Sequence, residues 1–181
     1  MGLSLADASS GGPISMRRTG GPDCLFILNS FLAFMRIRSF KPADLPTLSE
    51  IDQKCFPPGV SYSKDVLAAF IAHRTSRTWV AEHEGSIAGF LIADSEPVRI
   101  GHITTIDVLE GFRRRGVGTE LMDVAENWAR KAGLRLIYLE TAEDNLAAQA
   151  FYEARGYQKV DKVDGYYSNG QAAWVMVKHL M

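Results

Sequence analysis

Residues 106–118 read Ile-Asp-Val-Leu-Glu-Gly-Phe-Arg-Arg-Arg-Gly-Val-Gly, and this stretch decides the fold. A strand-like run at 103–108 leads into a loop with three consecutive arginines and two glycines, and an amphipathic helical pattern follows at once. Glycines let a backbone approach a ligand closely, and the first N–H groups of a helix have no partner within it. The stretch therefore predicts a binding site for the diphosphate of a cofactor.

Two familiar phosphate loops do not fit this stretch. A P-loop needs a Lys-Ser or Lys-Thr pair after its last glycine, and neither Gly116 nor Gly118 is followed by one. A dinucleotide-binding fingerprint needs a third glycine where this chain has Leu121. What remains is the motif Arg113-x-x-Gly116-x-Gly118. By itself, that motif also fits a solvated arginine turn before an ordinary helix.

The composition fits one globular domain. The chain has 181 residues, 46% of them hydrophobic, and a formal net charge of -1. That charge gives no global preference for nucleic acid or an anionic membrane. Cys24 and Cys55 provide neither a disulfide framework nor a metal-binding spacing, and the four histidines show no zinc pattern. We expect a cytoplasmic protein that binds no metal.

Residues 1–34 differ from the rest of the chain. Residues 1–23 are rich in Gly, Ser and Pro, and the apolar run at 24–34 is too short to cross a bilayer. A signal peptide does not fit, because the run continues into Met35-Arg36 without the expected cleavage site. We expect a disordered or weakly ordered extension at 1–34 and one domain at 35–181. A second interpretation is that Met35 is the true start and that 1–34 is not native.

From Met35 onward the pattern is regular. It predicts strands at 36–40, 78–82, 86–93, 99–108, 134–141, 157–163 and 172–178, and helices at 42–55, 63–72, 117–132 and 145–155. The strand–helix–strand unit across 117–132 should be a right-handed parallel crossover. The buried stripe of that helix is expected at Val117, Leu121, Val124, Ala125, Trp128 and Ala132.

This order of elements resembles the GNAT superfamily of acyl-CoA-dependent N-acyltransferases over about residues 35–181. The arginine loop matches the family's Gln/Arg-x-x-Gly-x-Gly/Ala motif, and residues 145–157 match its N-x-x-A-x-x-F/L-Y-x-x-x-G-F/Y segment. Leu139-Glu140 precedes that segment at the family's spacing, and Tyr166-Tyr167 precedes the last strand. The resemblance implies an α/β fold: a mixed, mostly antiparallel twisted sheet of about six or seven strands, one parallel crossover and about four helices.

Within the superfamily the chain is most similar to protein N-terminal acetyltransferases, especially the bacterial ribosomal-protein alanine type. The segment Cys55-Phe56-Pro57 and the double tyrosine carry this similarity. Two departures concern the acceptor side: Gln171 and Ala172 replace an acidic pair, and Gly165 replaces a larger residue. The peptide specificity is therefore left open.

The resemblance also implies the site residues. Acetyl-CoA would be bound by the strand and loop around the arginines and by the later helix, with parted strands leaving backbone groups of Ile106 and Val108 free for its pantetheine arm. The implied residues are Ile106, Asp107, Val108, Arg113, Arg114, Arg115, Gly116, Val117, Gly118, Thr119, Asn145 and Tyr152. Asn145 is also a plausible helix N-cap.

For catalysis the resemblance implies Glu140 as the base and Tyr152 as the proton donor to the leaving thiolate. The alternatives are an exposed carboxylate at a strand end and a core tyrosine. Cys55 could suggest an acyl-enzyme route, but no histidine is evidently paired with it, and we expect a buried or loop cysteine. The acceptor walls would be Phe56 and Tyr62 on one side and Tyr166 and Tyr167 on the other, although both tyrosines also fit simple hairpin packing.

Three functions are therefore compared. The leading hypothesis is an N-acetyltransferase that acts on a protein or peptide α-amine. The second has the same chemistry with a small-molecule amine, and the third is a non-catalytic acyl-CoA-binding module. The sequence leaves the acceptor and the acyl-chain length open, and it does not distinguish a monomer from a homodimer.

Overall fold

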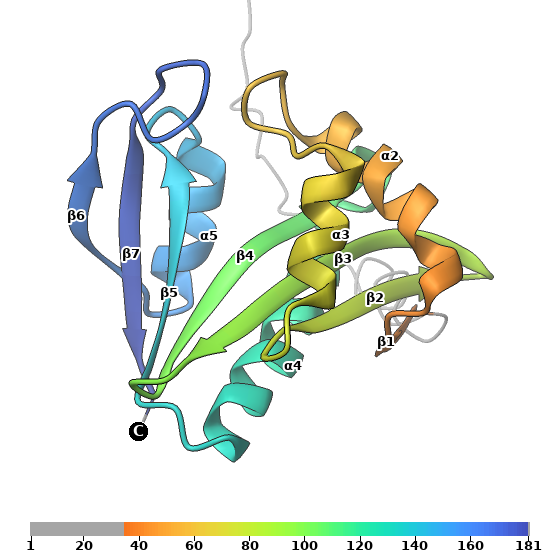
Figure 1. Cartoon of the computed structure of the whole chain (residues 1–181), viewed down its shortest axis with the longest axis horizontal. Helices are drawn as coiled ribbons and strands as arrows, with labels where there is room; N and C mark the ends of the chain where they lie inside the picture. Colours follow the sequence, from red (N-terminus) through yellow and green to blue (C-terminus); the bar gives the residue numbers. More distant parts are fainter. Residues whose placement is uncertain (1–34, 181) are drawn as a thin grey trace, which may run out of the picture.

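A seven-stranded sheet forms the centre of the molecule in the computed structural model, which describes residues 35–180 (Figure 1). The expectation for 1–34 lies outside the described residues. The strands lie in the order β1-β2-β3-β4-β5-β7-β6. Their bounds are β1 Met35–Ser39, β2 Arg77–His83, β3 Ser86–Glu96, β4 Ile100–Val108, β5 Leu136–Ala142, β6 Gln158–Val163 and β7 Ala173–His179. Among these, β4 and β5 form the parallel pair and the other neighbours are antiparallel.

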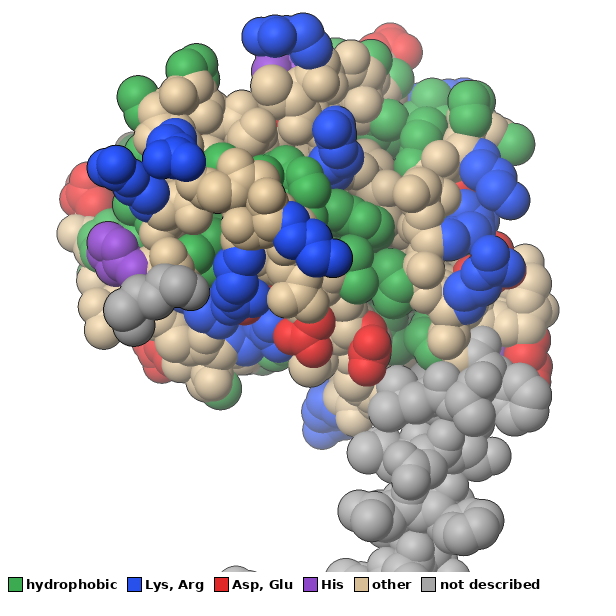
Figure 2. All heavy atoms as spheres, turned by 90° about the horizontal axis from the view of Figure 1, so that it is seen from below, with side chains coloured by type: hydrophobic (Ala, Val, Ile, Leu, Met, Phe, Trp, Pro, Cys, Tyr) green, Lys and Arg blue, Asp and Glu red, His purple; other side chains and the backbone are tan. Residues whose placement is uncertain are grey.

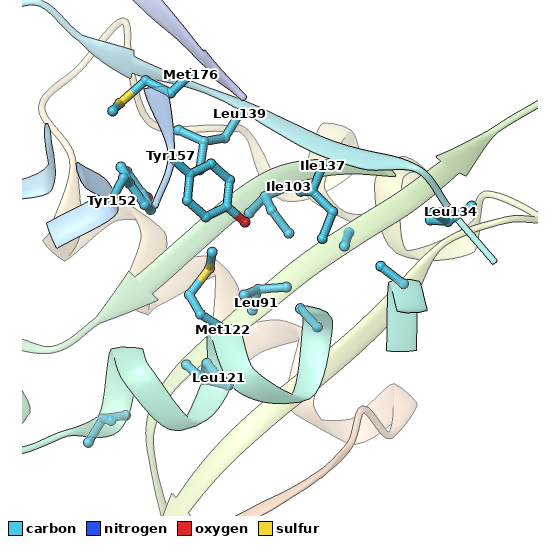
Figure 3. Packing of buried hydrophobic residues seen from close by; sticks show 14 of the residues in the cluster. Leu91, Ile103, Leu121, Met122, Leu134, Ile137, Leu139, Tyr152, Tyr157 and Met176 are labelled. Atoms are coloured by element: carbon cyan, nitrogen blue, oxygen red, sulfur yellow. The ribbon is translucent and has the colours of Figure 1, made fainter. Parts of the chain in front are cut away.

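Helices cover both faces of this sheet. On one face α2 (Leu45–Cys55) and α3 (Lys64–Ala72) enclose a core cluster with Val80, Phe90 and Ile92. On the other face α4 (Val117–Lys131) and α5 (Leu146–Ala154) pack on a second cluster, in which the Tyr157 ring lies among residues from β3, β4, β5, α4 and β7 (Figure 3). Short 3-10 turns, η1 at Pro42–Asp44 and η2 at Glu110–Phe112, precede α2 and α4. The predicted order of elements and the fold class are confirmed.

The parallel pair is short, and its early end shapes the site. Register pairs run only from Ile100 with Leu136 to Ile103 with Leu139. Residues 104–108 of β4 then continue without a partner on β5, while β5 stays paired with β7 as far as Ala142. Figure 1 shows the two strands diverging toward the loops at the upper end of the sheet. The predicted parting of the strands is therefore present.

The buried face of α4 differs from the predicted stripe. Val117, Leu121 and Ala125 are buried as expected, but Ala132 is exposed and Val124 and Trp128 are only partly buried. Met122, Glu126 and Ala129 are buried instead, because the helix turns this side toward β3 and β4. Glu126 is 2% exposed and forms ion pairs with three cations, Arg130, Arg155 and Lys178. The ion pairs with Arg155 and Lys178 thus allow the Glu126 carboxylate to be buried on this face of α4.

Candidate functional site

A cavity of about 340 Å³ lies where β4 and β5 part. Its walls come from the end of α2 and the loop after it, from β4 and β5, from the start of α5, and from the loop before β7. The lining residues include Phe56, Tyr62, Ile106, Glu140, Asn145, Tyr152, Tyr166 and Tyr167. The structure therefore brings together the two predicted catalytic residues and all four predicted acceptor residues.

Glu140 is the first residue of β5 beyond its pairing with β4. Its side chain is 15% exposed, and its Oε2 atom lies 2.9 Å from Nε2 of His102 on β4. Sequence reasoning missed His102, since the histidines showed no motif and only the register of β4 against β5 brings this one to Glu140. The cavity thus holds a carboxylate in hydrogen-bond contact with an imidazole.

Tyr152 enters the cavity from α5. The residue is 7% exposed, and its ring contacts those of Phe151 and Tyr157, with centroids 5.3 and 5.8 Å away. Burial, followed by the nearby Asp107, raises the pKa of Tyr152 above the ordinary value of a phenol, about 10. The phenol is therefore protonated at neutral pH and can donate a proton or a hydrogen bond.

The predicted free backbone of Val108 is only partly free. Its carbonyl oxygen accepts a hydrogen bond from Nε of Arg113 at 2.8 Å and one from Sγ of Cys55 at 3.5 Å. A strand carbonyl without a ladder partner takes donors from neighbouring side chains. Burial, followed by Asp107, raises the pKa of the Cys55 thiol, so this cysteine is not an activated nucleophile.

Asp107 points away from the neighbouring cofactor candidates. Its carbonyl oxygen lies against Gly89 of β3, and its side chain is 1% exposed on the face under α2 and α3. There Oδ1 accepts a hydrogen bond from Thr105 at 2.6 Å, while Oδ2 is buried without a partner. Burial raises the pKa of Asp107 well above its ordinary value, and the nearby Asp52 adds to this. The Asp107 side chain is therefore not part of the cavity lining, although Thr105, which binds it, is.

Asp52 and Gln53 of α2 hold Tyr62 in place through hydrogen bonds to its backbone. Oδ2 of Asp52 accepts the backbone N–H of Tyr62 at 2.7 Å, and the side-chain amide of Gln53 donates to the Tyr62 carbonyl at 2.7 Å. Asp52 is fully buried, and its Oδ1 has no hydrogen-bond partner. Burial raises the pKa of Asp52 to about 6. Tyr62 is thus held by both of its backbone polar groups.

The opposite wall carries the double tyrosine. The rings of Tyr166 and Tyr167 pack edge to face at 4.9 Å, and burial followed by Glu140 raises the pKa of Tyr166. The two walls meet above the cavity, because Ser168 donates from its backbone and its hydroxyl to the Gly59 carbonyl, at 3.2 and 3.0 Å. The loop after α2 and the loop before β7 are thus linked beside the cavity.

The arginine loop leads directly into the first turn of α4. Gly116 has φ +89°, a conformation that suits glycine, and Gly118 faces the Phe151 ring, which a Cβ would meet at 3.5 Å. The predicted residues Arg114, Arg115, Val117 and Thr119 flank these glycines. Asn145 caps α5 by accepting the Ala148 N–H at 3.1 Å, so its predicted N-cap role is confirmed. The helix start and the basic loop lie beside the parted end of β4.

The charge of the cavity suits a cationic ligand. Glu140 and Asp144 belong to its lining, whereas no Lys or Arg does.

Among residues 35–180, no group of three or more His, Cys, Asp or Glu could hold a metal ion, and no helix is long and apolar enough to cross a membrane.

A second, shallower hollow has a different chemistry. It is lined by Trp79 and Trp128, whose rings lie 5.7 Å apart, and by Arg77, Lys131 and three smaller residues. Viewed from below, the molecule shows many Lys and Arg side chains between hydrophobic ones (Figure 2). The lining of this hollow has no carboxylate, imidazole, thiol or phenol that could transfer a proton. The cavity between β4 and β5 is therefore the candidate catalytic site.

Known proteins share this fold and about a quarter to a third of the aligned residues. The family model described as the Acetyltransferase (GNAT) family matches residues 45–157. An uncharacterized N-acetyltransferase of Methanocaldococcus jannaschii is 30% identical over 145 residues, which cover 80% of this chain and 91% of the relative. An N-alpha-acetyltransferase of Sulfurisphaera tokodaii is 27% identical over 163 residues, covering 80% and 93%.

Solved structures agree with the sequence comparisons. Ard1 from Thermoplasma volcanium superposes with a TM-score of 0.76 at 26% identity, covering 82% of this chain and 99% of that one. The ribosomal-protein-S18-alanine N-acetyltransferase from Escherichia coli gives a TM-score of 0.73 at 24% identity, covering 80% and 93%. The predicted resemblance, including the alanine-type neighbour, is confirmed at the level of the fold.

Proposed function

Because the chain belongs to the GNAT family and is an acetyl-CoA-dependent acetyltransferase, we propose that its acceptor is the α-amine of a peptide or protein N-terminus. The observation that carries this proposal is that Glu140 and Tyr152 line one cavity at the parting of β4 and β5. A base and an acid are thereby available on either side of a reacting carbonyl. The similarity to N-alpha-acetyltransferases supports the choice of an N-terminal amine.

The chain's residues fit acetyl-CoA. The segment of β4 beyond Ile103 has no strand partner on the β5 side, so backbone groups around Ile106 can pair with the amides of the pantetheine arm. The first N–H groups of α4 and the basic side chains of Arg113, Arg114 and Arg115 suit a diphosphate. Acetyl-CoA supplies the thioester whose acetyl group is transferred. To bind the arm at the Val108 carbonyl, an amide of the arm would replace one of its two present donors, Arg113 or Cys55.

Glu140 takes a proton from the incoming amine, which is mostly protonated at neutral pH and must be neutral to attack. His102 holds the carboxylate through the 2.9 Å contact. The amine nitrogen forms a bond to the acetyl carbon and the carbon–sulfur bond breaks. Tyr152, whose pKa is raised, donates a proton to the departing thiolate, and the proton that the amide nitrogen then loses restores the phenol. A backbone N–H of the unpaired β4 segment is suited to stabilise negative charge on the carbonyl oxygen.

The shape and charge of the acceptor walls favour a narrow substrate that carries an amine. Phe56 and Tyr62 face Tyr166 and Tyr167, and the bridge between Gly59 and Ser168 limits the width of the approach. Carboxylates without nearby cations in the lining favour a positively charged group over an acidic one. An extended peptide N-terminus satisfies both conditions.

An acceptor panel tests this proposal. Thiol release from acetyl-CoA would be measured with short peptides that have free N-termini, Ala and Ser starts included, and with the same peptides blocked at the N-terminus and carrying a lysine. Polyamines and free amino acids complete the panel. The proposal predicts turnover with the free-N-terminus peptides. Turnover with small amines alone would assign the site to small-molecule acetylation instead.

A further inference from the structure

Tyr138 and His102 face each other across the last part of the parallel ladder. They are register partners, and their rings stack with centroids 4.5 Å apart and planes 14° from parallel. One pair further along, at Ile103 and Leu139, the pairing of β4 with β5 ends. The stack therefore lies next to the point where the strands part, on the face that also carries Glu140 two residues after Tyr138.

The Tyr138 ring is itself fixed at its far end. Its hydroxyl donates a hydrogen bond of 2.8 Å to Oε1 of Glu96, the final residue of β3. Burial, followed by this carboxylate, raises the pKa of Tyr138, so the hydroxyl remains a donor. Three neighbouring strands thus contribute to one chain of contacts that runs from Glu96 through Tyr138 and His102 to Glu140.

A single hydrogen bond leaves an imidazole free to rotate, because the second side-chain torsion of histidine has a broad energy profile. In this structure the stacked Tyr138 ring removes that freedom and sets the plane of the imidazole. Nε2 is then directed along the sheet to the carboxylate of Glu140, at 2.9 Å. Tyr138 interacts with Glu140 electrostatically, whereas its ring contact is with His102, so any effect of the ring on the orientation of the base acts through His102.

We propose that Tyr138 is a positioning residue for catalysis: by stacking on His102, it holds the imidazole that orients the base Glu140. This inference rests on the proposed function, since it assumes that Glu140 acts as the base. The stacking face of the ring carries the role, and the hydroxyl only anchors it. Tyr138→Leu should therefore lower kcat, whereas Tyr138→Phe should preserve most of it.

A double-mutant cycle tests the inference. Tyr138→Leu and Tyr138→Phe would each be made in the wild-type chain and in His102→Gln, with kcat and the KM for acetyl-CoA measured and folding followed by thermal melting. We expect Tyr138→Leu to lower kcat about tenfold with KM within about twofold, and Tyr138→Phe to recover most of that loss. In the His102→Gln background, Tyr138→Leu should cause no further loss of kcat.

The outcomes separate the two proposals. If Tyr138→Leu lowers kcat equally in both backgrounds, its effect is structural and the positioning role is refuted; an undiminished kcat in the wild-type background refutes it as well. Both results can be interpreted only if the wild-type enzyme is active and Glu140→Gln lowers its activity. If the wild-type chain acetylates only small amines, the proposed acceptor fails while the positioning role is still tested with those amines; if Glu140→Gln is fully active, the base assignment fails and the positioning role fails with it.

Discussion

Nε2 of His102 lies 2.9 Å from Oε2 of Glu140, although their strands stop pairing between the two positions. The contact spans the point at which β4 and β5 part, and so it places a carboxylate with a fixed partner at the edge of the cavity. Tyr152 of α5 lines the same cavity as Glu140.

Removing the charge of Glu140 should abolish most turnover. Glu140→Gln keeps the size of the side chain but cannot accept the amine proton, and kcat should fall by about 100-fold or more. The affinity for acetyl-CoA, measured by calorimetry, should change less than about twofold. Glu143→Gln is the matched control, because that neighbouring carboxylate pairs with Lys162 and does not line the cavity.

Replacing Tyr152 by Phe should leave binding intact and slow the chemical step. The ring is buried and its packing is preserved, while the proton donor to the thiolate is lost. We expect kcat to fall about 100-fold with little change in the KM for acetyl-CoA. Because its pKa is raised, the wild-type phenol should stay protonated up to pH 9. An unchanged kcat in Tyr152→Phe would remove this residue from the mechanism.

Asp52→Asn should stabilise the protein at neutral pH. The pKa of Asp52 in the fold, about 6, exceeds the ordinary value of 3.8, so the folded chain holds this proton more tightly than the unfolded chain. Stability from this group is therefore present at low pH and is lost as pH rises from about 4 through about 6. Asn keeps an acceptor for the Tyr62 N–H and carries no charge.

Urea unfolding at pH 4.5 and 7.5 measures this effect. The gain of Asp52→Asn over wild type should reach no more than about 3 kcal/mol at pH 7.5 and should shrink toward pH 4.5. Asp164→Asn serves as the control, since that side chain is 93% exposed, and its small effect should be equal at both pH values. A destabilised Asp52→Asn at pH 7.5 would show that the buried charge has an unrecognised compensating partner.

The two glycines of the arginine loop should respond differently to alanine. Gly116 has φ +89°, so Gly116→Ala should cost about 1–2 kcal/mol of stability and weaken acetyl-CoA binding roughly tenfold by shifting the start of α4. A Cβ on Gly118 would make an ordinary 3.5 Å contact with Phe151, so Gly118→Ala should keep the wild-type melting temperature or raise it slightly. Thermal melts and calorimetric titration with acetyl-CoA check both.

The element order followed from the sequence because each element depends on local signals, such as the N-cap Ser63 and the run into Gly116. The site residues Glu140, Asn145 and Tyr152 were identified through the resemblance to the GNAT motifs. His102 was missed because its meaning depends on which residue of β5 lies opposite it. The buried face of α4 was misjudged since the cations that pair with Glu126 come from distant elements as well as its own helix.

The burial of two carboxyl groups could likewise not be predicted from local sequence signals. Asp52 lies in an amphipathic helix and Asp107 in a strand, and neither position marks the residue as buried until α2 packs on β4. The carbonyl of Val108 was expected to be free because β4 and β5 part before this residue. Its occupation by Arg113 and Cys55 depends on side-chain positions that a motif does not encode.

A competition between two amines of one peptide tests whether the acceptor is an N-terminal amine. A peptide with a free N-terminal alanine and one internal lysine would be incubated with the protein and acetyl-CoA, and fragment mass spectrometry would locate the acetyl group. The account predicts acetylation of the α-amine, with the lysine unmodified, and no product with Glu140→Gln. Acetylation of the lysine alone, or equal product from Glu140→Gln, would contradict it.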